Sequence, residues 1–325
     1  MIPTTRRVRP TLLARLVLFG ALTALPFVLL SSSQAWAQTA APSGSPLAGN
    51  AMWVWYTPKP SRVDAMIAQL KRAHMSSVFI KSADGTTPWP QFNRQLVDRL
   101  HSAGIHVCAW HYVYGTHPRT EARVSALAYR AGAECMIIDA ETEYEGRPRA
   151  AWYYTHELRS LTSSKWTIGL STFPYLKYHA SFPYRVFLRR GAATVNLPQM
   201  YWRDIGVSPA KIVRDTYKVN RNLGRPVYPI GQTWNSPGTG ELRAFQQAAR
   251  QAGAKGVSWW DWSQTSRRGW NELQGPDLFK SPIVSATRQV HTHAATHAVT
   301  AISKLIGRVA NIVPTAMLTK PFVSN

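Results

Sequence analysis

Eight short apolar runs with strand-like composition alternate with helix-like stretches along most of this chain. The runs cover residues 52–56, 77–81, 105–112, 135–140, 167–171, 194–201, 227–232 and 256–260. The helix-like stretches between them include residues 61–73, 92–103, 120–131, 150–161, 209–220 and 240–251. Strands that alternate with helices pair in parallel, and eight such repeats can close into a ring. The pattern therefore predicts an α/β fold, a (β/α)8 TIM barrel over residues 51–283.

An open, doubly wound sheet is the alternative arrangement for the same alternation. That fold has a glycine-rich phosphate turn after an early strand, and this sequence has none there. The connection between the fifth and sixth runs is irregular and contains Phe173-Pro174-Tyr175 and Phe182-Pro183-Tyr184. These tyrosines and prolines predict an ordered loop with a short helix.

The two ends of the chain differ in composition from the predicted barrel. Residues 1–37 combine a basic start, an apolar segment and a small-x-small pattern at Ala35-Trp36-Ala37. These features predict a secretory signal peptide, with an uncleaved membrane anchor as the alternative. Residues 38–50 predict a flexible leader. The expected location is therefore secreted, extracellular or at the cell surface.

Residues 284–325 form a basic segment without any acidic side chain. Apolar residues recur in it at helical spacing up to Pro314, which predicts an amphipathic helical tail. Such a helix could lie against the barrel or a partner, or it could bind a membrane surface.

The chain is strongly basic, with 38 Lys and Arg against 16 Asp and Glu and a formal net charge of +22. This charge favours anionic partners such as a cell-wall polymer or a membrane surface. The basic residues are dispersed and form no DNA- or RNA-binding motif, so nucleic acid is not an expected partner. No cofactor is expected, and no zinc-type cysteine spacing is present. Cys108 and Cys135 fall in consecutive predicted strands, where they could form a disulfide or remain buried free thiols.

Acidic residues are concentrated at the end of the fourth predicted strand. Five of the 16 acidic residues lie between Glu134 and Glu145. On a strand, alternate side chains share a face, so Asp139, Glu141 and Glu143 are expected to point the same way. Like charges at short range raise the pKa of at least one carboxyl group, as a general acid requires. A solvated loop after a buried strand is the alternative interpretation.

The other predicted strand ends are rich in aromatic and polar residues. An active site in such a barrel lies at the carboxyl ends of the strands. Aromatic faces beside carboxylates and amides suit sugar rings, whereas core filling is the alternative role of each single tryptophan. The candidate substrate-binding residues are Trp53, Trp55, Lys81, Asp84, Trp110, His111, Glu143, Gln199, Gln232, Trp234, Trp260 and Asp261.

Three motifs in this order resemble those of chitinase-type, family 18 glycoside hydrolases. Asp139-Ala-Glu141 resembles the Asp-x-Glu motif at the end of the fourth strand. Gln199-Met-Tyr201 resembles the motif of the sixth strand, and Trp260 resembles the tryptophan that floors the sugar site. The resemblance covers residues 51–275. It implies a glycosidase with Glu141 as general acid, Asp139 as its orienting partner and Tyr201 as a group that steadies charge at the anomeric centre.

The sequence also departs from this family. Two further aspartates that precede Asp-x-Glu in the family are Glu134 and Ile137 here, and Trp202 replaces the Asp or Asn after the tyrosine. The lysozyme-like family 25 barrels also share Asp-x-Glu, but they carry a first-strand aspartate that this chain lacks. Residues 80–89 are similar to a segment of uncharacterised secreted bacterial barrels, which indicates fold and export only.

Two classes of function follow, namely a secreted glycosidase acting on a polysaccharide or peptidoglycan and a non-catalytic barrel that binds a carbohydrate or the cell wall. A membrane-associated scaffold that works through the tail is a third. In a glycosidase, an N-acetyl group of the substrate can act as nucleophile; otherwise Asp261 or Glu143 must supply the second carboxylate. His111 could be a site residue or a core histidine, and Lys81 and Asp84 could pair with each other.

Overall fold

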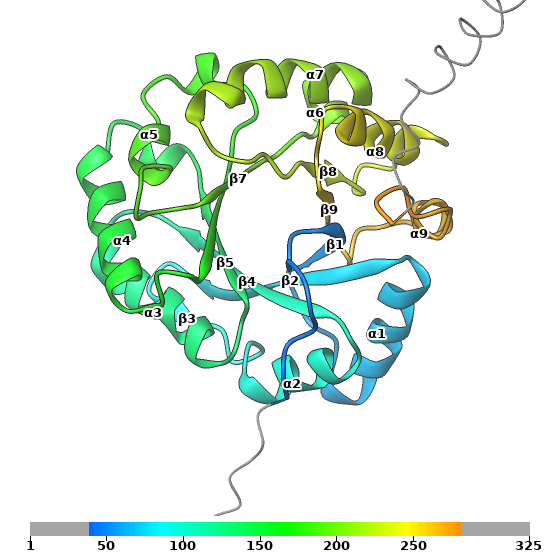
Figure 1. Ribbon diagram of the computed structural model, residues 1–325, viewed down its shortest axis with the longest axis horizontal. Coiled ribbons are helices and arrows are strands. Elements are labelled where there is room, and N and C mark those ends of the chain that lie inside the picture. Colours follow the sequence, from blue (N-terminus) through cyan, green and yellow to red (C-terminus); the bar gives the residue numbers. More distant parts are fainter. Residues whose placement is uncertain (1–38, 281–325) are drawn as a thin grey trace, which may run out of the picture. The chain divides into compact units, whose positions relative to one another are not determined.

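A ring of eight parallel strands forms the centre of the protein in a computed structural model that describes residues 39–280 (Figure 1). The strands of the ring are β1 Gly49–Val54, β2 Met75–Asp84, β4 His106–Val113, β5 Cys135–Ala140, β6 Thr167–Thr172, β7 Val195–Pro198, β8 Ile230–Gln232 and β9 Gly256–Trp260. They pair in the order β7-β6-β5-β4-β2-β1-β9-β8. Two isolated parallel bridges, Asn196 with Val227 and Gln199 with Ile230, connect β7 with the segment of β8. The predicted α/β TIM-barrel fold is confirmed.

Helices follow the strands and surround the ring (Figure 1). They are α1 Val63–Arg72, α2 Arg94–Ser102, α3 Pro118–Arg130, α4 Pro148–Ser160, α5 Tyr184–Phe187, α6 Trp202–Ile205, α7 Pro209–Asn220, α8 Glu241–Gln251 and α9 Arg267–Leu273. Short 3-10 turns are η1 Pro60–Arg62, η2 Thr142–Tyr144, η3 Leu176–His179 and η4 Arg221–Leu223. A two-residue strand, β3 Thr87–Pro88, pairs with β2 in antiparallel orientation.

Side-chain caps explain where several helices begin. The side chain of Asn93 accepts a hydrogen bond from the N–H of Leu96, and Ser208 does the same for Lys211. Such caps satisfy N–H groups that have no partner within the helix. Proline occupies the first turn of α3, α4 and α7, where its missing N–H is tolerated. Local sequence therefore fixes these helix starts.

Apolar side chains fill two layers, one between the strands and the helices and one inside the ring. Alternate residues of β5 divide between them, because Met136 and Ile138 pack with the helices whereas Cys135 and Ile137 face the interior. The interior layer also contains Trp53, Phe79, Trp110, Val195, Leu197 and Ile230. This packed floor leaves only the strand ends available for a site.

A disulfide joins Cys108 of β4 to Cys135 of β5. The two residues are register partners on neighbouring strands, their Cα atoms are 4.6 Å apart, and both side chains are fully buried. The sequence left the bridge and the free thiols as alternatives. The structure contains the bridge.

The element boundaries differ in places from the prediction. Strand β1 begins at Gly49 and Leu47 is buried in the interior layer, so this end of the predicted leader 38–50 belongs to the barrel. Strand β8 is shorter than predicted and begins at Ile230. The irregular connection between β6 and β7 contains η3 and α5, as the prediction of a short helix there required. Helix α9 had not been predicted.

The predicted signal peptide 1–37 and basic tail 284–325 lie outside the described residues. None of the helices within residues 39–280 is long and apolar enough to cross a membrane.

Candidate active site

Two carboxyl groups share one amide donor at the carboxyl end of β5. Nε2 of Gln199 lies 3.0 Å from Oδ1 of Asp139 and 2.9 Å from Oε1 of Glu141. Asp139 is inside the ring because it alternates with Cys135 and Ile137, and Glu141 follows the strand. Gln199 reaches them from the end of β7. The fold thus brings Gln199 against two residues that precede it in the sequence by 58 and 60 positions.

Both carboxyl groups have raised pKa values. Burial is the main cause for Asp139, and the charge of Glu141 adds to it, although bonds from Ser171 and Gln199 and the charge of Lys81 act in the opposite direction. Burial also raises the pKa of Glu141, against the bond from Gln199, and the charge of Glu143 raises it further. The predicted increase for Glu141 is therefore present. However, its largest cause is burial rather than neighbouring charge.

Glu143 does not continue the strand, so the prediction that all three carboxylates share a strand face is wrong. β5 ends at Ala140, and Glu143 lies in the 3-10 turn η2. Its two carboxylate oxygens each accept from the hydroxyl of Tyr112 at 3.0 Å. Burial and the nearby carboxylates raise the pKa of Tyr112, which keeps this hydroxyl protonated as a donor.

Tyr201 lies beside the carboxyl pair after β7. Burial and the charges of Asp139 and Glu141 raise its pKa well above the usual value. Its phenol is thus a neutral hydrogen-bond donor. Its ring meets that of Trp234 at 88°, with the centroids 6.3 Å apart.

Four indoles line the interior next to the carboxyl pair. Trp260 lies 5.3–5.6 Å from Trp53, Trp55 and Trp110 by ring centroids. Trp53 and Trp110 are each 1% exposed, and their N–H groups bond to Ser258 and to the carbonyl of Val54. The structure therefore places Trp53 and Trp110 in the packed floor rather than on a face open to a ligand. Trp55 and Trp260 are partly exposed above them.

Lys81 is buried among aromatic rings and pairs with Asp84. Its ammonium group lies 2.6 Å from the carboxylate of Asp84 and 4.5–4.9 Å from the ring centroids of Trp55, Trp89 and Trp110. Asp84 also accepts from the hydroxyl of Tyr114 at 2.8 Å. The interpretation that Lys81 and Asp84 pair with each other is confirmed. Cation–π contacts and the ion pair together allow a buried charge here.

His111 is a core histidine rather than a member of the site. It points from β4 towards α3, where its ring nitrogens contact the hydroxyl of Ser125 at 2.6 Å and the carbonyl of Gly85 at 2.9 Å. Burial lowers its pKa to about 4 despite the bond to Gly85. The sequence interpretation that favoured a site residue is wrong, because alternation along β4 turns His111 outwards and Trp110 inwards.

Gln232 and Asp261 hold the loops around the site. The side chain of Gln232 accepts from the N–H of Arg203 and donates to the carbonyl of Trp234. Asp261 is fully buried and accepts from the hydroxyl of Ser263 at 2.8 Å and the N–H of Gln264 at 3.0 Å. Both were predicted to bind substrate, but their polar side-chain atoms form hydrogen bonds with other groups of the protein.

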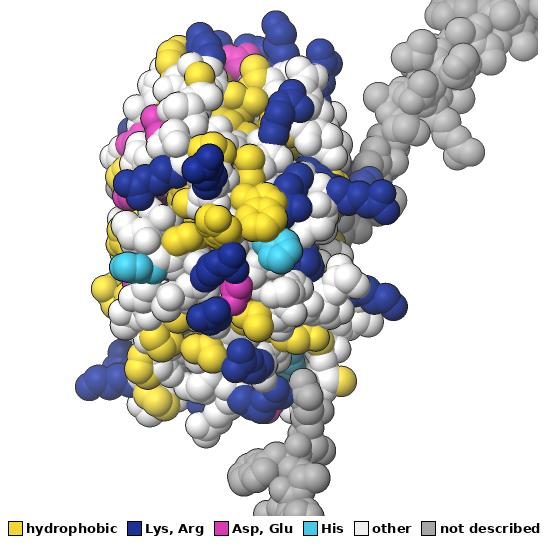
Figure 2. All heavy atoms as spheres, turned by 90° about the vertical axis from the view of Figure 1, so that its left-hand side faces the viewer, with side chains coloured by type: hydrophobic (Ala, Val, Ile, Leu, Met, Phe, Trp, Pro, Cys, Tyr) yellow, Lys and Arg dark blue, Asp and Glu magenta, His cyan; other side chains and the backbone are white. Residues whose placement is uncertain are grey.

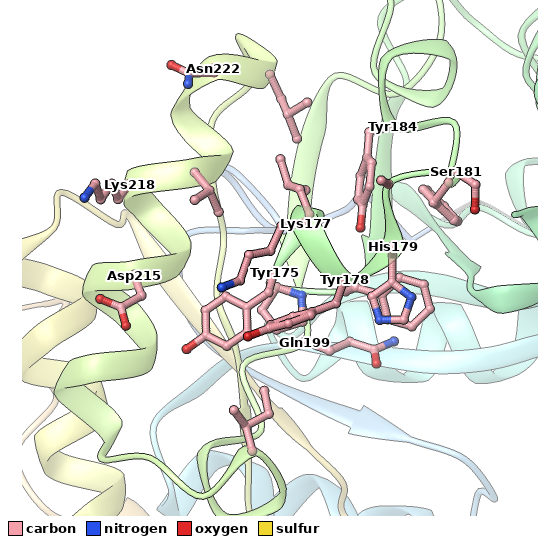
Figure 3. A pocket seen from close by; sticks show the side chains of 18 of the residues that line it. Tyr175, Lys177, Tyr178, His179, Ser181, Tyr184, Gln199, Asp215, Lys218 and Asn222 are labelled. Carbon is pink, nitrogen blue, oxygen red and sulfur yellow. The ribbon is translucent and has the colours of Figure 1, made fainter.

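A groove next to the carboxyl pair was not predicted (Figure 3). It has a volume of about 1570 Å³ and lies between the β6–β7 connection and the α6–α7 region, with Gln199 and Tyr201 among its lining residues. His179 also lines it, accompanied by Tyr175 and Tyr178. The irregular aromatic connection after β6 was the available signal, but residues in a long loop have no periodicity that predicts where they point.

Ser171 is a further polar residue beside the carboxyl pair that was not predicted from the sequence. Its hydroxyl donates to Asp139 at 2.9 Å, and Gln199 donates to Ser171 at 3.1 Å. Its position at the end of the fifth predicted strand was the signal that could have identified it. Among the described residues, no group of three or more His, Cys, Asp and Glu side chains could hold a metal ion.

Comparisons with solved structures found chains of similar fold. The chain is similar to the spore cortex-lytic enzyme SleL of Bacillus cereus, with 11% identity and a TM-score of 0.53 over 71% of this chain and 75% of that chain. It is also similar to active domain 2 of a Pyrococcus furiosus chitinase, with 10% identity, a TM-score of 0.48 and coverage of 67% and 86%. A dihydrodipicolinate synthase of Rhodopseudomonas palustris aligns with 11% identity, a TM-score of 0.42 and coverage of 67% and 72%.

No protein-family model and no curated protein matches this sequence. The identities of these structures are low, so the likeness concerns the fold alone. The chain folds as a barrel similar to that of SleL, which agrees with the predicted fold.

Proposed function

We propose that this protein is a secreted glycoside hydrolase that cleaves a cell-wall or extracellular polysaccharide, with Glu141 as general acid. The observation that carries the proposal is the carboxyl pair of Asp139 and Glu141, held by Gln199 at the carboxyl end of a barrel strand. Burial raises the pKa of Glu141, and a general acid must be protonated near the working pH.

The reaction assigns a role to each group around the pair. Glu141 gives its proton to the glycosidic oxygen, which becomes the hydroxyl of the leaving sugar. Asp139 orients Glu141 and the substrate, and the neutral phenol of Tyr201 donates to an oxygen near the anomeric centre. Trp55 and Trp260 offer partly exposed rings for a sugar face.

The anomeric carbon that loses the glycosidic oxygen must form a new bond. It bonds either to a nucleophile, whose adduct water then hydrolyses, or directly to a water that a base deprotonates. Gln264 and Ser263 already engage the buried carboxylate of Asp261, which makes it a poor candidate. Glu143 is partly exposed and held by one phenol. An N-acetyl group of the substrate or Glu143 is therefore the better candidate.

Surface charge and structural likeness support an extracellular polymer as substrate. Figure 2 shows Lys and Arg side chains spread among hydrophobic ones over one face of the barrel, with few acidic side chains between them. Such a face attracts anionic polymers. SleL, whose barrel is similar, is described as a spore cortex-lytic enzyme.

A non-catalytic carbohydrate-binding barrel is the second candidate. Glu134 occupies a position at which the chitinase-type motif has an aspartate. However, it lies before β5 and its carboxylate bonds to His101 and His106. Ile137, at the other such position, is in the packed interior. The site thus lacks the upstream carboxylates of the chitinase-type motif, and this observation favours binding without turnover.

Reducing-sugar release tests the proposal. Wild type, Glu141→Gln and the surface variant Glu157→Gln would be incubated with peptidoglycan, chitin and acidic glycans. Release by wild type and Glu157→Gln, but not by Glu141→Gln, is the expected result. Absence of release by all three, with each protein still retained by one polymer, would establish the binding barrel instead.

A further inference from the structure

We infer that the groove beside the carboxyl pair binds carboxylate-bearing sugars, so that the polysaccharide chain is acidic where it leaves the site. This inference rests on the proposed function and specifies its substrate class. The walls of the groove supply both positive charge and exposed aromatic rings.

The groove adjoins the amide that holds the carboxyl pair. Gln199 and Tyr201 are among its lining residues, and Gln199 donates to both carboxyl groups. His179 also lines the groove, and its charge acts on the pKa of Glu141. With a volume of about 1570 Å³, the groove exceeds the space that one small ligand needs. A chain bound at Glu141 can therefore extend into it.

Cationic side chains stand on both walls of the groove. Lys177 and Arg185 come from the β6–β7 connection, and Lys218 and Arg221 come from α7 and η4. All four are exposed, and none of them has a carboxylate partner within residues 39–280. These cations are free to pair with a ligand.

Acidic side chains do not cancel this charge. Asp215 is already bound by Lys211 at 2.5 Å and contacts Arg214 at 3.4 Å. Asp204 is the other acidic residue that lines the groove. The excess positive charge between two protein walls favours an anionic chain over a neutral one.

Exposed aromatic rings lie next to the cations. Tyr178 is 67% exposed, and the ammonium group of Lys177 lies 4.6 Å from its ring centroid. In Figure 3 the side chains of Tyr175, Lys177 and Tyr178 extend from their loop into the space between it and α7. A ring that stacks on a sugar face beside an ammonium group that pairs with its carboxylate suits a sugar acid. The single, separated cations suit isolated carboxylates better than a phosphate, which favours clustered or bidentate donors.

Binding to the inactive full-length Glu141→Gln protein tests the inference without turnover. The probes are an oligogalacturonate, a peptidoglycan fragment with free carboxylates and a neutral chito-oligosaccharide, and the measurement is calorimetric affinity. In this background, Lys218→Gln with Arg221→Gln would be compared with Arg130→Gln and Lys255→Gln. The control pair removes the same charge at the opposite end of the strands, where both side chains are exposed.

The variant with Lys218→Gln and Arg221→Gln is expected to bind at least one acidic probe about tenfold more weakly. The variant with Arg130→Gln and Lys255→Gln is expected to bind that probe with unchanged affinity. The probe affected identifies the source of the carboxylate. Lys177→Glu, from the other wall, should give the same selective loss. Unchanged affinity for both acidic probes in the groove variants, or an equal loss with the neutral probe, would overturn the inference. Sugar release from a neutral polysaccharide by wild type in that case would leave the proposed function standing.

Discussion

The side-chain amide of Gln199 donates to Glu141 at 2.9 Å from the end of a strand two places away in the barrel. The same nitrogen lies 3.0 Å from Asp139. Each bond lowers a pKa that burial raises, so one amide acts on the pKa of both groups. Five predictions follow from this arrangement and from the packing around it.

Replacing Glu141 by Gln should lower the hydrolysis rate about 10²–10⁴-fold, because a general acid contributes about that much. The substitution keeps the shape of the side chain, so binding of an oligosaccharide should change little. Single-turnover kinetics and calorimetry separate the two quantities. Glu157→Gln on α4 is the matched control, and a Glu141→Gln protein with wild-type turnover would refute the assignment.

Replacing Gln199 by Leu should move the alkaline limb of the pH–rate profile to higher pH. The bond from Gln199 lowers the pKa of Glu141, so its loss raises that pKa and keeps the acid protonated at higher pH. The profile of kcat/KM between pH 4 and pH 9 measures the shift. A limb that moves to lower pH would show that Glu141 is not the group that titrates.

Asp139→Asn should stabilise the folded protein at neutral pH while lowering its activity. The pKa of Asp139 is raised in the folded state, so its stabilising contribution is present below the unfolded pKa and is lost as pH rises through the folded pKa. A neutral amide at this position avoids the loss and raises the free energy of unfolding by about 1 kcal/mol. Urea unfolding at pH 5 and pH 8 should show a larger gain at pH 8. An equal gain at both would mean that the charge of Asp139 is not its cause.

Glu134 should make the barrel sensitive to acid. Burial opposes its ionisation, but bonds from His101, His106 and the N–H of Val107 outweigh burial and lower its pKa to about 2. Its contribution to the free energy of unfolding, about 3 kcal/mol, is therefore present above the unfolded pKa. It is lost as pH falls from about 4.5 towards about 2. Glu134→Gln should remove most of this dependence in unfolding titrations, whereas Glu272→Gln should keep it.

Removing the disulfide with Cys108→Ala and Cys135→Ala should destabilise the protein by about 3–4 kcal/mol. The bridge closes a loop with a sequence separation of 27 between two neighbouring strands. Denaturant unfolding of the double variant against wild type measures the difference. An unchanged midpoint would mean that the bridge does not stabilise the protein by restricting the unfolded chain.

The sequence allowed the barrel to be predicted because eight strand-like runs alternate with helix-like stretches along it. It also predicted that Asp139, Glu141, Gln199 and Tyr201 lie at one end of the barrel, where strand ends meet, and the structure places Gln199 against both carboxyl groups. The prediction failed for side chains whose direction could not be assigned from their place at a strand end. His111 and Trp110 are neighbours, yet only the alternation of β4 sends one towards the helices and the other inside.

The loops could not be predicted to the same depth. Gln232 and Asp261 follow strand ends like true ligand-binding residues, but backbone groups of nearby loops already engage them. The groove residues Lys177 and Tyr178 belong to a connection without periodicity. Their placement depends on η3 and α5, which pack against helices that are distant in sequence.

The four indoles in the barrel floor and directly above it also have an optical consequence. Centroid distances of 5.3–5.8 Å among Trp53, Trp55, Trp110 and Trp260 are short enough for excitation to pass from one ring to another. A sugar that stacked on Trp55 or Trp260 would therefore change the fluorescence of the cluster. Ligand titrations can therefore be followed by intrinsic fluorescence, without a label and in the absence of any turnover.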